Sequence, residues 1–161
     1  MQRALRTLLV GTALACGGGA VALAADATSP LTGTWTLNLA KSKFDAGQEL
    51  KSQTRTYTQD TDGTSVTVTG TRADGSAVSQ QSTFKYDNKA YPWNGAADYD
   101  AISLKRVNGS TVTAVLMKAG KKVGTTTRSI SGHGKILTLS SKITGADGKA
   151  YSVVLVLDKQ S

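Results

Sequence analysis

Residues 135–158, KILTLSSKITGADGKAYSVVLVLD, contain two extended runs separated by a short turn. In the first run Leu137 and Leu139 alternate with polar residues, which is the pattern of a strand with one buried face. Between the runs, Asp147-Gly148 provides residues that tolerate the positive φ of a tight hairpin turn. In the second run, 151–157, apolar residues occupy both faces, as in a strand packed where a sheet closes. The stretch predicts an antiparallel hairpin.

Turn sequences of the same kind, mostly 11 to 15 residues apart, recur along the chain and separate runs rich in Thr and Val. The turns are Asp62-Gly63, Asp74-Gly75, Asp87-Asn88, Asn108-Gly109, Ala119-Gly120-Lys121, Gly132-His133-Gly134 and Asp147-Gly148. The predicted strands are Leu31–Leu39, Lys51–Gln59, Thr64–Arg72, Ser76–Tyr86, Tyr99–Val107, Ser110–Lys118, Lys121–Ser131, Lys135–Thr144 and Tyr151–Asp158. Because β-branched side chains suit a pleated surface, the sequence predicts an all-β, antiparallel up-and-down meander with very little helix.

The edges of such a meander decide its architecture. A row of sequential antiparallel strands leaves two exposed edges unless the first and last strands pair. We therefore expect closure into a single β-barrel of about 8–10 strands. A two-sheet sandwich would have the same turns, so this alternative stays open. Outside the strands, residues 40–50 are expected to form a loop or short helical turn anchored by Phe44, and Lys89–Asp98 a second long loop.

The first 24 residues have the features of a secretory signal peptide. Arg3 and Arg6 precede an almost wholly apolar run over residues 8–23. The run ends on Ala22-Leu23-Ala24, which provides the small residues that a signal peptidase recognises. A retained membrane anchor is the alternative, which the glycines at 17–19 and the short run disfavour.

We expect cleavage after Ala24, or in a variant after Ala27, and export to the periplasm or the extracellular medium. Residues 25–30 would then be a linker and 31–161 a single domain of a size that can bury a substantial core. Cys16, the only cysteine, lies in the leader, so the mature chain would have no disulfide. A loose lipobox around Cys16 leaves a lipid-anchored protein as the minor alternative.

The mature chain is basic. Loss of Arg3 and Arg6 with the leader lowers the formal net charge from +8 to +6. Lys118, Lys121 and Lys122 lie around one turn, and such a field favours anionic envelope surfaces. A solvated surface is the simpler interpretation. No aromatic nucleic-acid-binding motif accompanies the charge, so the sequence does not predict a nucleic-acid partner.

Residues for catalysis and metal binding are scarce. His133 is the only histidine and lies in a turn, and the mature chain would lack cysteine, so the sequence predicts no metal site and no cofactor. It also lacks the constellation of a Ser-His-Asp or Cys-His triad. Asp98 and Asp100 would share one face if extended, which leaves a carboxylate hydrolase as the weakest hypothesis.

Gly33-Thr34-Trp35-Thr36-Leu37 resembles the Gly-x-Trp opening of the first strand in lipocalins and fatty-acid-binding proteins, the calycin group. The longer stretch 33–44, GTWTLNLAKSKF, and the segment 99–106, YDAISLKR, are similar to a group of secreted, mostly uncharacterised bacterial proteins of lipocalin-like character. The resemblance implies a lipocalin-like barrel whose closed end is covered by Trp35 and whose interior binds a small hydrophobic molecule.

The chain also departs from these families. Residues 40–50 are too few for the helical hairpin of fatty-acid-binding proteins. Leu155-Val156-Leu157 replaces the Arg-x-Tyr pair that holds the ligand carboxylate in those proteins, so a fatty acid is not indicated. Lipocalins place an arginine over the tryptophan near the end of the barrel, and Arg128 is the candidate for that position here.

Non-catalytic binding of a small, apolar molecule inside the barrel is the function that the resemblance implies. Candidate lining residues are Trp35, Phe84, Tyr86, Leu104 and Leu116. Tyr91 and Trp93 in the second long loop are candidates for ligand contact, although Trp93 as a plug of the barrel end is the simpler interpretation. The alternative is a structural or interaction protein of the cell envelope, with a filled barrel and a basic outer face. A binder needs roughly 300 Å³ of concave space, which a filled barrel lacks.

Overall fold

The computed structural model describes residues 29–161, which form eleven antiparallel strands and one short 3-10 turn, η1 (Leu39–Lys41). The predicted leader and most of the predicted linker lie outside these residues. The strands are β1 (Gly33–Leu37), β2 (Lys43–Phe44), β3 (Leu50–Asp60), β4 (Gly63–Arg72), β5 (Ala77–Phe84), β6 (Asp87–Pro92), β7 (Ala101–Arg106), β8 (Thr111–Lys118), β9 (Lys121–Ser131), β10 (Ile136–Thr144) and β11 (Ala150–Lys159).

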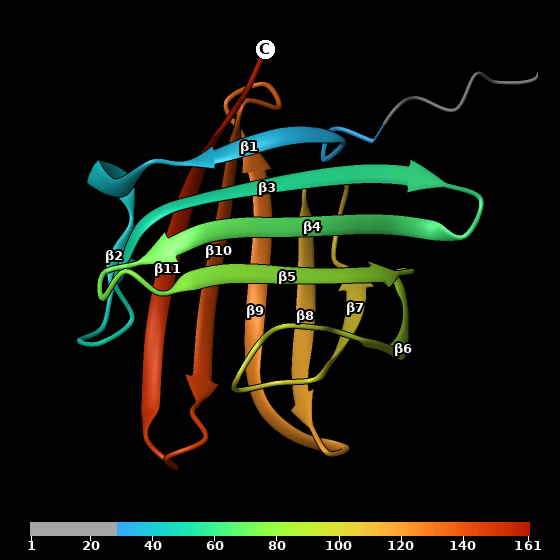
Figure 1. The fold of residues 1–161 in the computed structure, drawn as a ribbon. Coiled ribbons are helices and arrows are strands. Elements are labelled where there is room, and N and C mark those ends of the chain that lie inside the picture. Colours follow the sequence, from blue (N-terminus) through green and yellow to red (C-terminus); the bar gives the residue numbers. More distant parts are fainter. Residues whose placement is uncertain (1–28) are drawn as a thin grey trace, which may run out of the picture.

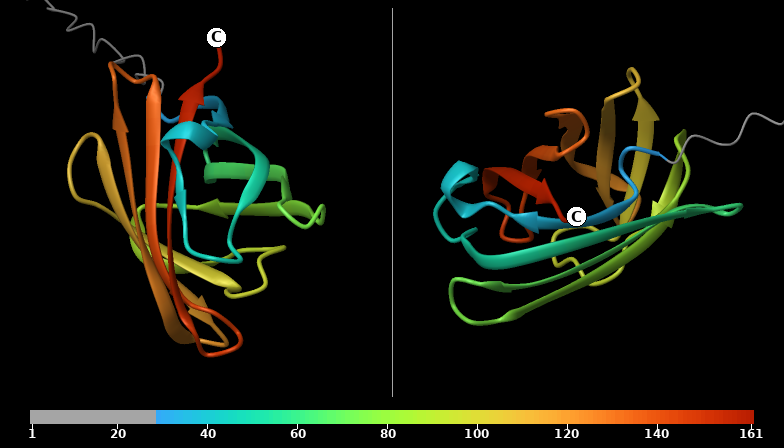
Figure 2. Two further views of the ribbon diagram at one scale, coloured as in Figure 1. Left: turned by 90° about the vertical axis from the view of Figure 1, so that its left-hand side faces the viewer. Right: turned by 90° about the horizontal axis from the view of Figure 1, so that it is seen from above.

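The strands form one sheet that curls into a nearly closed barrel (Figure 1). The order is β5-β4-β3-β1-β11-β10-β9-β8-β7-β6, and β2 pairs with β11 beyond the end of β1. Strands β3 to β5 cross in front of β8 to β11, and Figure 2 shows these two groups on opposite sides of the molecule. The prediction of an all-β meander that closes into a barrel is confirmed.

Closure is made where the first strand, β1, pairs with the last strand, β11. Trp35 pairs with Lys159 and Leu37 with Leu157, so β1 joins the first half of the meander to its last strand. The other side of the barrel is looser. Between β5 and the segment that follows β6, the described chain has one isolated bridge, in which the backbones of Gln81 and Asn94 exchange two hydrogen bonds. The barrel therefore has a firm seam between β1 and β11 and a weak seam between β5 and the chain around β6.

The chain reverses direction at the turns that the sequence predicts. Asn88 and His133 have positive φ, as Gly63, Gly75, Gly120 and Gly148 do, whereas Gly109 does not. His133 thus lies in a tight turn at the molecular surface, between β9 and β10. The positions of these turns agree with the local preferences of their residues.

Two strands were not predicted. Lys89–Asp98 was expected to be a loop, but its first part belongs to β6, because Ala90 and Tyr91 pair with Ser103 and Ile102 of β7. The strand β2 lies in the stretch expected to be a loop, where Phe44 pairs with Val153. Both strands are short and mostly exposed, so the alternation that marks a half-buried strand is missing from their sequences.

The core fills the barrel with the apolar face of each strand. Leu104 on β7, Leu116 on β8, and Leu137 and Leu139 on β10 are all buried, as the alternation predicts. The described chain contains no helix with the length and apolar character of a membrane span.

Candidate functional site

Trp35 seals the end of the barrel at the firm seam. Its side chain is fully buried, and its Nε1 donates a hydrogen bond to the carbonyl oxygen of Leu31 at 2.8 Å. Lys159 Nζ lies 5.2 Å from the centre of the indole. The expectation that Arg128 covers this ring is wrong, because the pairing of β1 with β11 places Lys159 directly opposite Trp35.

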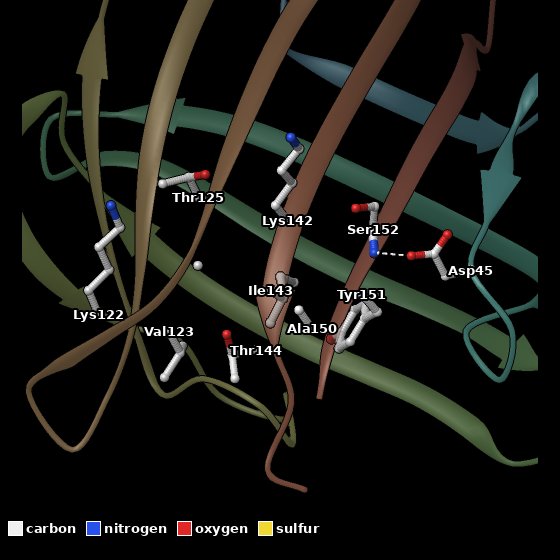
Figure 3. Close-up of a pocket in the computed structure, with 11 residues that line it drawn as sticks. Asp45, Lys122, Val123, Thr125, Lys142, Ile143, Thr144, Ala150, Tyr151 and Ser152 are labelled. Atoms are coloured by element: carbon white, nitrogen blue, oxygen red, sulfur yellow. Dashed lines mark hydrogen bonds between the residues drawn. The ribbon is translucent and has the colours of Figure 1, made fainter. Parts of the chain in front are cut away.

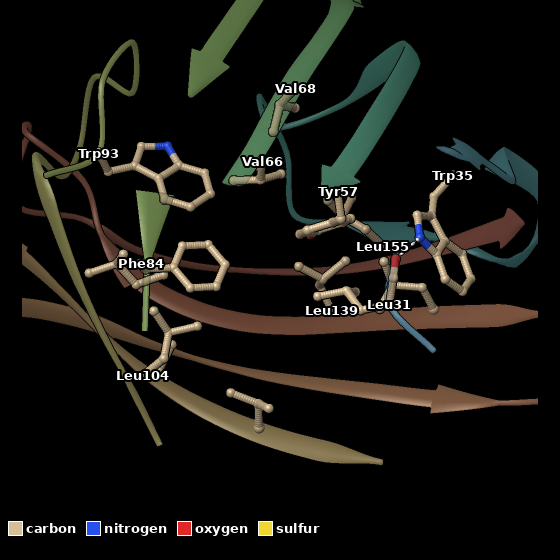
Figure 4. Close-up of a cluster of buried hydrophobic side chains, with 14 of the residues drawn as sticks. Leu31, Trp35, Tyr57, Val66, Val68, Phe84, Trp93, Leu104, Leu139 and Leu155 are labelled. Carbon is tan, nitrogen blue, oxygen red and sulfur yellow. Dashed lines mark hydrogen bonds between the residues drawn. The ribbon is translucent and has the colours of Figure 1, made fainter. Parts of the chain in front are cut away.

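Two cavities lie in the interior of the barrel. The smaller, about 30 Å³, is lined mainly by apolar side chains. Figure 4 shows the buried apolar cluster around it, with the lining residues Trp93, Phe84 and Leu104 on one side and Trp35 and Leu31, which do not line the cavity, on the other. The lining residues are Arg55, Tyr57, Phe84, Trp93, Ile102, Leu104, Val112, Ala114, Thr126, Arg128 and Leu139. By volume, this cavity holds one or two water-sized atoms.

The larger cavity, about 100 Å³, is more polar and lies beside the 96–99 loop and β2. Its polar lining includes Gln53, Arg55, Arg72, Gln80, Asp98, Tyr99 and Tyr151. We call it the mouth cavity and the smaller one the inner cavity. Arg55 lines both, so its guanidinium marks the boundary between them.

Arg55 is a buried cation that the pattern of apolar residues did not reveal. Only 6% of its surface is exposed, and its Nε donates to Gln53 Oε1 at 2.9 Å. A signal for it was present, since Gln53, Arg55 and Tyr57 alternate along β3 and must share one face. Polar residues that share a strand face with a buried tyrosine indicate that this face points into an interior with hydrogen-bonded polar groups.

Arg128 is the second buried cation. Its Nη2 donates a hydrogen bond to Tyr86 Oη at 2.7 Å. The guanidinium carbon lies 5.4 to 5.9 Å from the ring centres of Tyr57, Phe84 and Tyr86. These three aromatic faces attract the cation and hold its side chain against the inner cavity.

Trp93 closes the inner cavity next to the weak seam. It is 5% exposed, and its Nε1 donates to Gln80 Oε1 at 3.1 Å. Its ring is tilted against Tyr99, with the ring centres 5.7 Å apart. Trp93 therefore fills space inside the barrel, which favours the plug over a residue exposed for ligand contact.

The predicted lining residues fall into three groups. Phe84, Trp93 and Leu104 line the inner cavity. Trp35 and Leu116 are buried elsewhere in the core, and Tyr86 and Tyr91 are half-buried. Tyr86 lies beside the cavity through its bond with Arg128, whereas Tyr91 turns toward Asp87, to which its hydroxyl donates at 2.8 Å.

The carboxylates of Asp98 and Asp100 accept hydrogen bonds that tie their loop to neighbouring turns. Asp98 accepts hydrogen bonds from Tyr151 Oη at 2.6 Å and from the amide of Ala146 at 3.0 Å. Asp100 accepts one from the amide of Ala119 at 3.1 Å. Burial and the bond to Asp98 raise the pKa of Tyr151. Since the two acids bind different turns, their contacts do not form a catalytic pair.

An open groove of about 410 Å³ lies on the surface of β9 to β11 (Figure 3). Lys122 and Lys142 flank it, and Asp45 Oδ2 accepts a hydrogen bond from the amide of Ser152 at 2.6 Å. Lys142 points away from the interior because its neighbour Ile143 is buried. The groove is open to solvent, and it shares Ile143 and Tyr151 with the lining of the mouth cavity.

The comparisons with known proteins support the fold. A scan against protein-family models finds no match, and a search of the curated proteins finds none. Among solved structures, the chain is similar to zebrafish ileal bile acid-binding protein complexed with cholic acid: TM-score 0.50, 18% identity, 82% of this chain and 100% of that one. It also matches a redesigned β-barrel, mFAP1, bound to DFHBI: TM-score 0.41, 16% identity, 78% of this chain and 94% of that one. The first match is a calycin-like barrel, consistent with the fold expected from the resemblance.

Proposed function

We propose that this chain is an exported, non-catalytic binding protein that holds a small, largely apolar molecule inside its barrel. The observation that carries the proposal is the inner cavity, whose apolar lining is continuous with the core while Arg55 connects it to the mouth cavity. Small-molecule sites are typically apolar concavities with a few placed polar groups. The solved relative, a bile acid-binding protein, supports the same class of function.

Volume limits what can bind. The two cavities, about 30 and 100 Å³, are smaller than the roughly 300 Å³ of a typical small-molecule site. Binding therefore requires a compact ligand and movement of Trp93, whose release adds the space of its indole to the inner cavity. Trp93 is suited to this movement because one side-chain hydrogen bond holds it and the neighbouring seam is weak. The ligand enters from the mouth cavity and displaces the plug.

The test is native mass spectrometry of the mature protein purified from its source. We expect one retained small molecule in the wild type. Ala114→Leu, which adds three carbons to the inner cavity, removes it. Thr113→Leu on the exposed face of the same strand is the matched control and retains it. A bare protein mass in the wild type, or equal occupancy in both variants, would contradict the proposal.

Export is supported by the charge and apolar pattern of residues 1–24. Amino-terminal sequencing of the purified protein tests it, with Ala25 expected as the first residue. A mature chain that begins at Met1 would refute export, and a lipid-modified Cys16 would favour the anchored form.

An envelope protein with a filled barrel is the second candidate, and the small interior volume favours it. Its outer face would use the groove flanked by Lys122 and Lys142 to contact anionic surfaces. Co-sedimentation with anionic vesicles, compared with neutral ones, tests this function. Loss of that binding in the Lys122→Gln/Lys142→Gln double variant, together with an empty interior, would support it over ligand binding.

A further inference from the structure

The interior of the barrel contains two cations without an anionic partner. Arg55 and Arg128 are 6% and 8% exposed. Within residues 29–161 neither guanidinium has a carboxylate oxygen within 4.0 Å, and the ion pairs of this part of the chain are made by lysines at the surface. Buried charges in proteins are normally paired, because removing an ion from water is costly.

The hydrogen bonds of the two side chains leave donors unused. A guanidinium offers five N–H donors. In the described part of the chain, Arg55 donates to Gln53 and Arg128 to Tyr86, one bond each. Both partners are neutral, so neither compensates a charge. No wholly buried side-chain nitrogen of the described residues lacks a hydrogen-bond partner, so the unused donors of the two arginines are accessible to a water-sized group. The aromatic rings around Arg128 attract its charge but cannot accept hydrogen bonds in the plane of the guanidinium.

Neighbouring tyrosines do not supply the missing charge. Tyr99 lines the mouth cavity beside Arg55, and burial raises the pKa of Tyr99 to about 12. Its hydroxyl therefore stays neutral in the physiological range. Strand β11 contributes Tyr151, Val153 and Leu155 to the mouth cavity, so no carboxylate enters from the last strand. The carboxylate of Asp98 does line the mouth cavity, but it accepts hydrogen bonds from Tyr151 Oη and the amide of Ala146 and makes no ion pair with Arg55.

We infer that Arg55 and Arg128 form an anion site in the inner cavity, which takes a compact singly charged group. Both side chains line this cavity, and its volume suits one such group. The inference rests on the proposed function when the group is the end of the bound molecule, which would then be an amphipathic anion such as a carboxylate. A free halide has the same chemistry and would occupy the site when no ligand is bound.

The test measures the melting temperature of the mature protein at constant ionic strength. Sodium bromide is the free-anion probe, with sodium gluconate, too large for the cavity, as its control. Sodium hexanoate is the ligand-like probe, with neutral 1-hexanol as its control. We expect bromide and hexanoate to raise the melting temperature of the wild type above the values in their controls.

Variants assign the effect to the two arginines. Arg55→Met and Arg128→Met should lose the response to both anions and bind hexanoate about tenfold more weakly, the effect of one charged hydrogen bond. If Arg55→Met does not fold, Arg55→Lys replaces it in the test. This variant keeps the charge and should retain part of the response. Lys105→Met is the control, since Lys105 is exposed and lines neither cavity, and it should respond as the wild type does.

The outcomes separate the site from the proposed function. Stabilisation by hexanol as strong as by hexanoate, without any response to bromide, would overturn the anion site and leave binding of an apolar molecule intact. A response to bromide alone would support the site and contradict ligand binding. An equal response of the wild type, Arg55→Met and Arg128→Met would refute the site.

Discussion

Replacement of Trp35 by alanine tests whether the seam between β1 and β11 holds the barrel together. The indole is fully buried, and truncation of such a side chain costs about 3–5 kcal/mol through lost transfer energy and the cavity left behind. The carbonyl of Leu31 also loses its donor, which adds about 1 kcal/mol. We therefore expect Trp35→Ala to lower the free energy of unfolding by about 4–6 kcal/mol.

The assay is urea denaturation of the mature chain followed by far-UV circular dichroism, which does not depend on tryptophan emission. Trp35→Phe keeps most of the buried ring and should lose about 1–3 kcal/mol, so it gives a graded result if the alanine variant does not fold. Leu39→Ala is the control, because Leu39 is 47% exposed, and its change should stay within about 0.5 kcal/mol. A loss below about 1 kcal/mol for Trp35→Ala would refute the role of the seam.

Three further perturbations test other parts of the structure. Gly124→Ala should lower the free energy of unfolding by more than about 2 kcal/mol, because an added Cβ would lie 2.5 Å from a backbone oxygen of β10. Gly109→Ala is the control and should change this free energy little, because an added Cβ there would lie in open space. Equal losses for the two variants in urea denaturation would contradict the prediction. Tyr99 has a pKa of about 12 in the folded chain, against the ordinary value of 10.0. Its contribution to the free energy of unfolding is therefore complete below pH 10 and is lost as the pH rises to 12, a decrease of about 1–3 kcal/mol. Tyr99→Phe should remove this part of the fall, and an unchanged pH profile would refute it. Asp98→Asn weakens the bond to Tyr151 and should cost about 1–2 kcal/mol without loss of any hydrolytic turnover, which a panel of ester and glycoside substrates would check.

The fold was predictable because its information is local. Turn residues such as Asp147-Gly148 fix where the chain reverses, and alternation along β10 fixes which side of each strand is buried. Closure followed from the cost of leaving edges open, and the pairing of Trp35 with Lys159 confirms it. Short strands such as β6 escaped prediction because only pairing with β7 defines them.

The interior was less predictable, since it depends on contacts between distant strands. Phe84 and Leu104 were predicted as lining residues, and Trp93 as a ligand contact or a plug in the second long loop; the structure places all three at the inner cavity. Arg55 was missed because a search for apolar faces passes over a charged residue, even one that alternates with a buried tyrosine. Arg128 was expected to cover Trp35, but the register between strands places it against Tyr86. How much space remains between these side chains is a property of packing, which sequence periodicity does not contain.

A crystal structure of the mature protein purified from its source tests the central claim most directly. We predict electron density for one small molecule in contact with Leu104, with Trp93 moved from its place beside Gln80 and an anionic group next to Arg55. An interior filled by side chains alone, with Trp93 still bonded to Gln80 and no density beside Arg55, would contradict the claim.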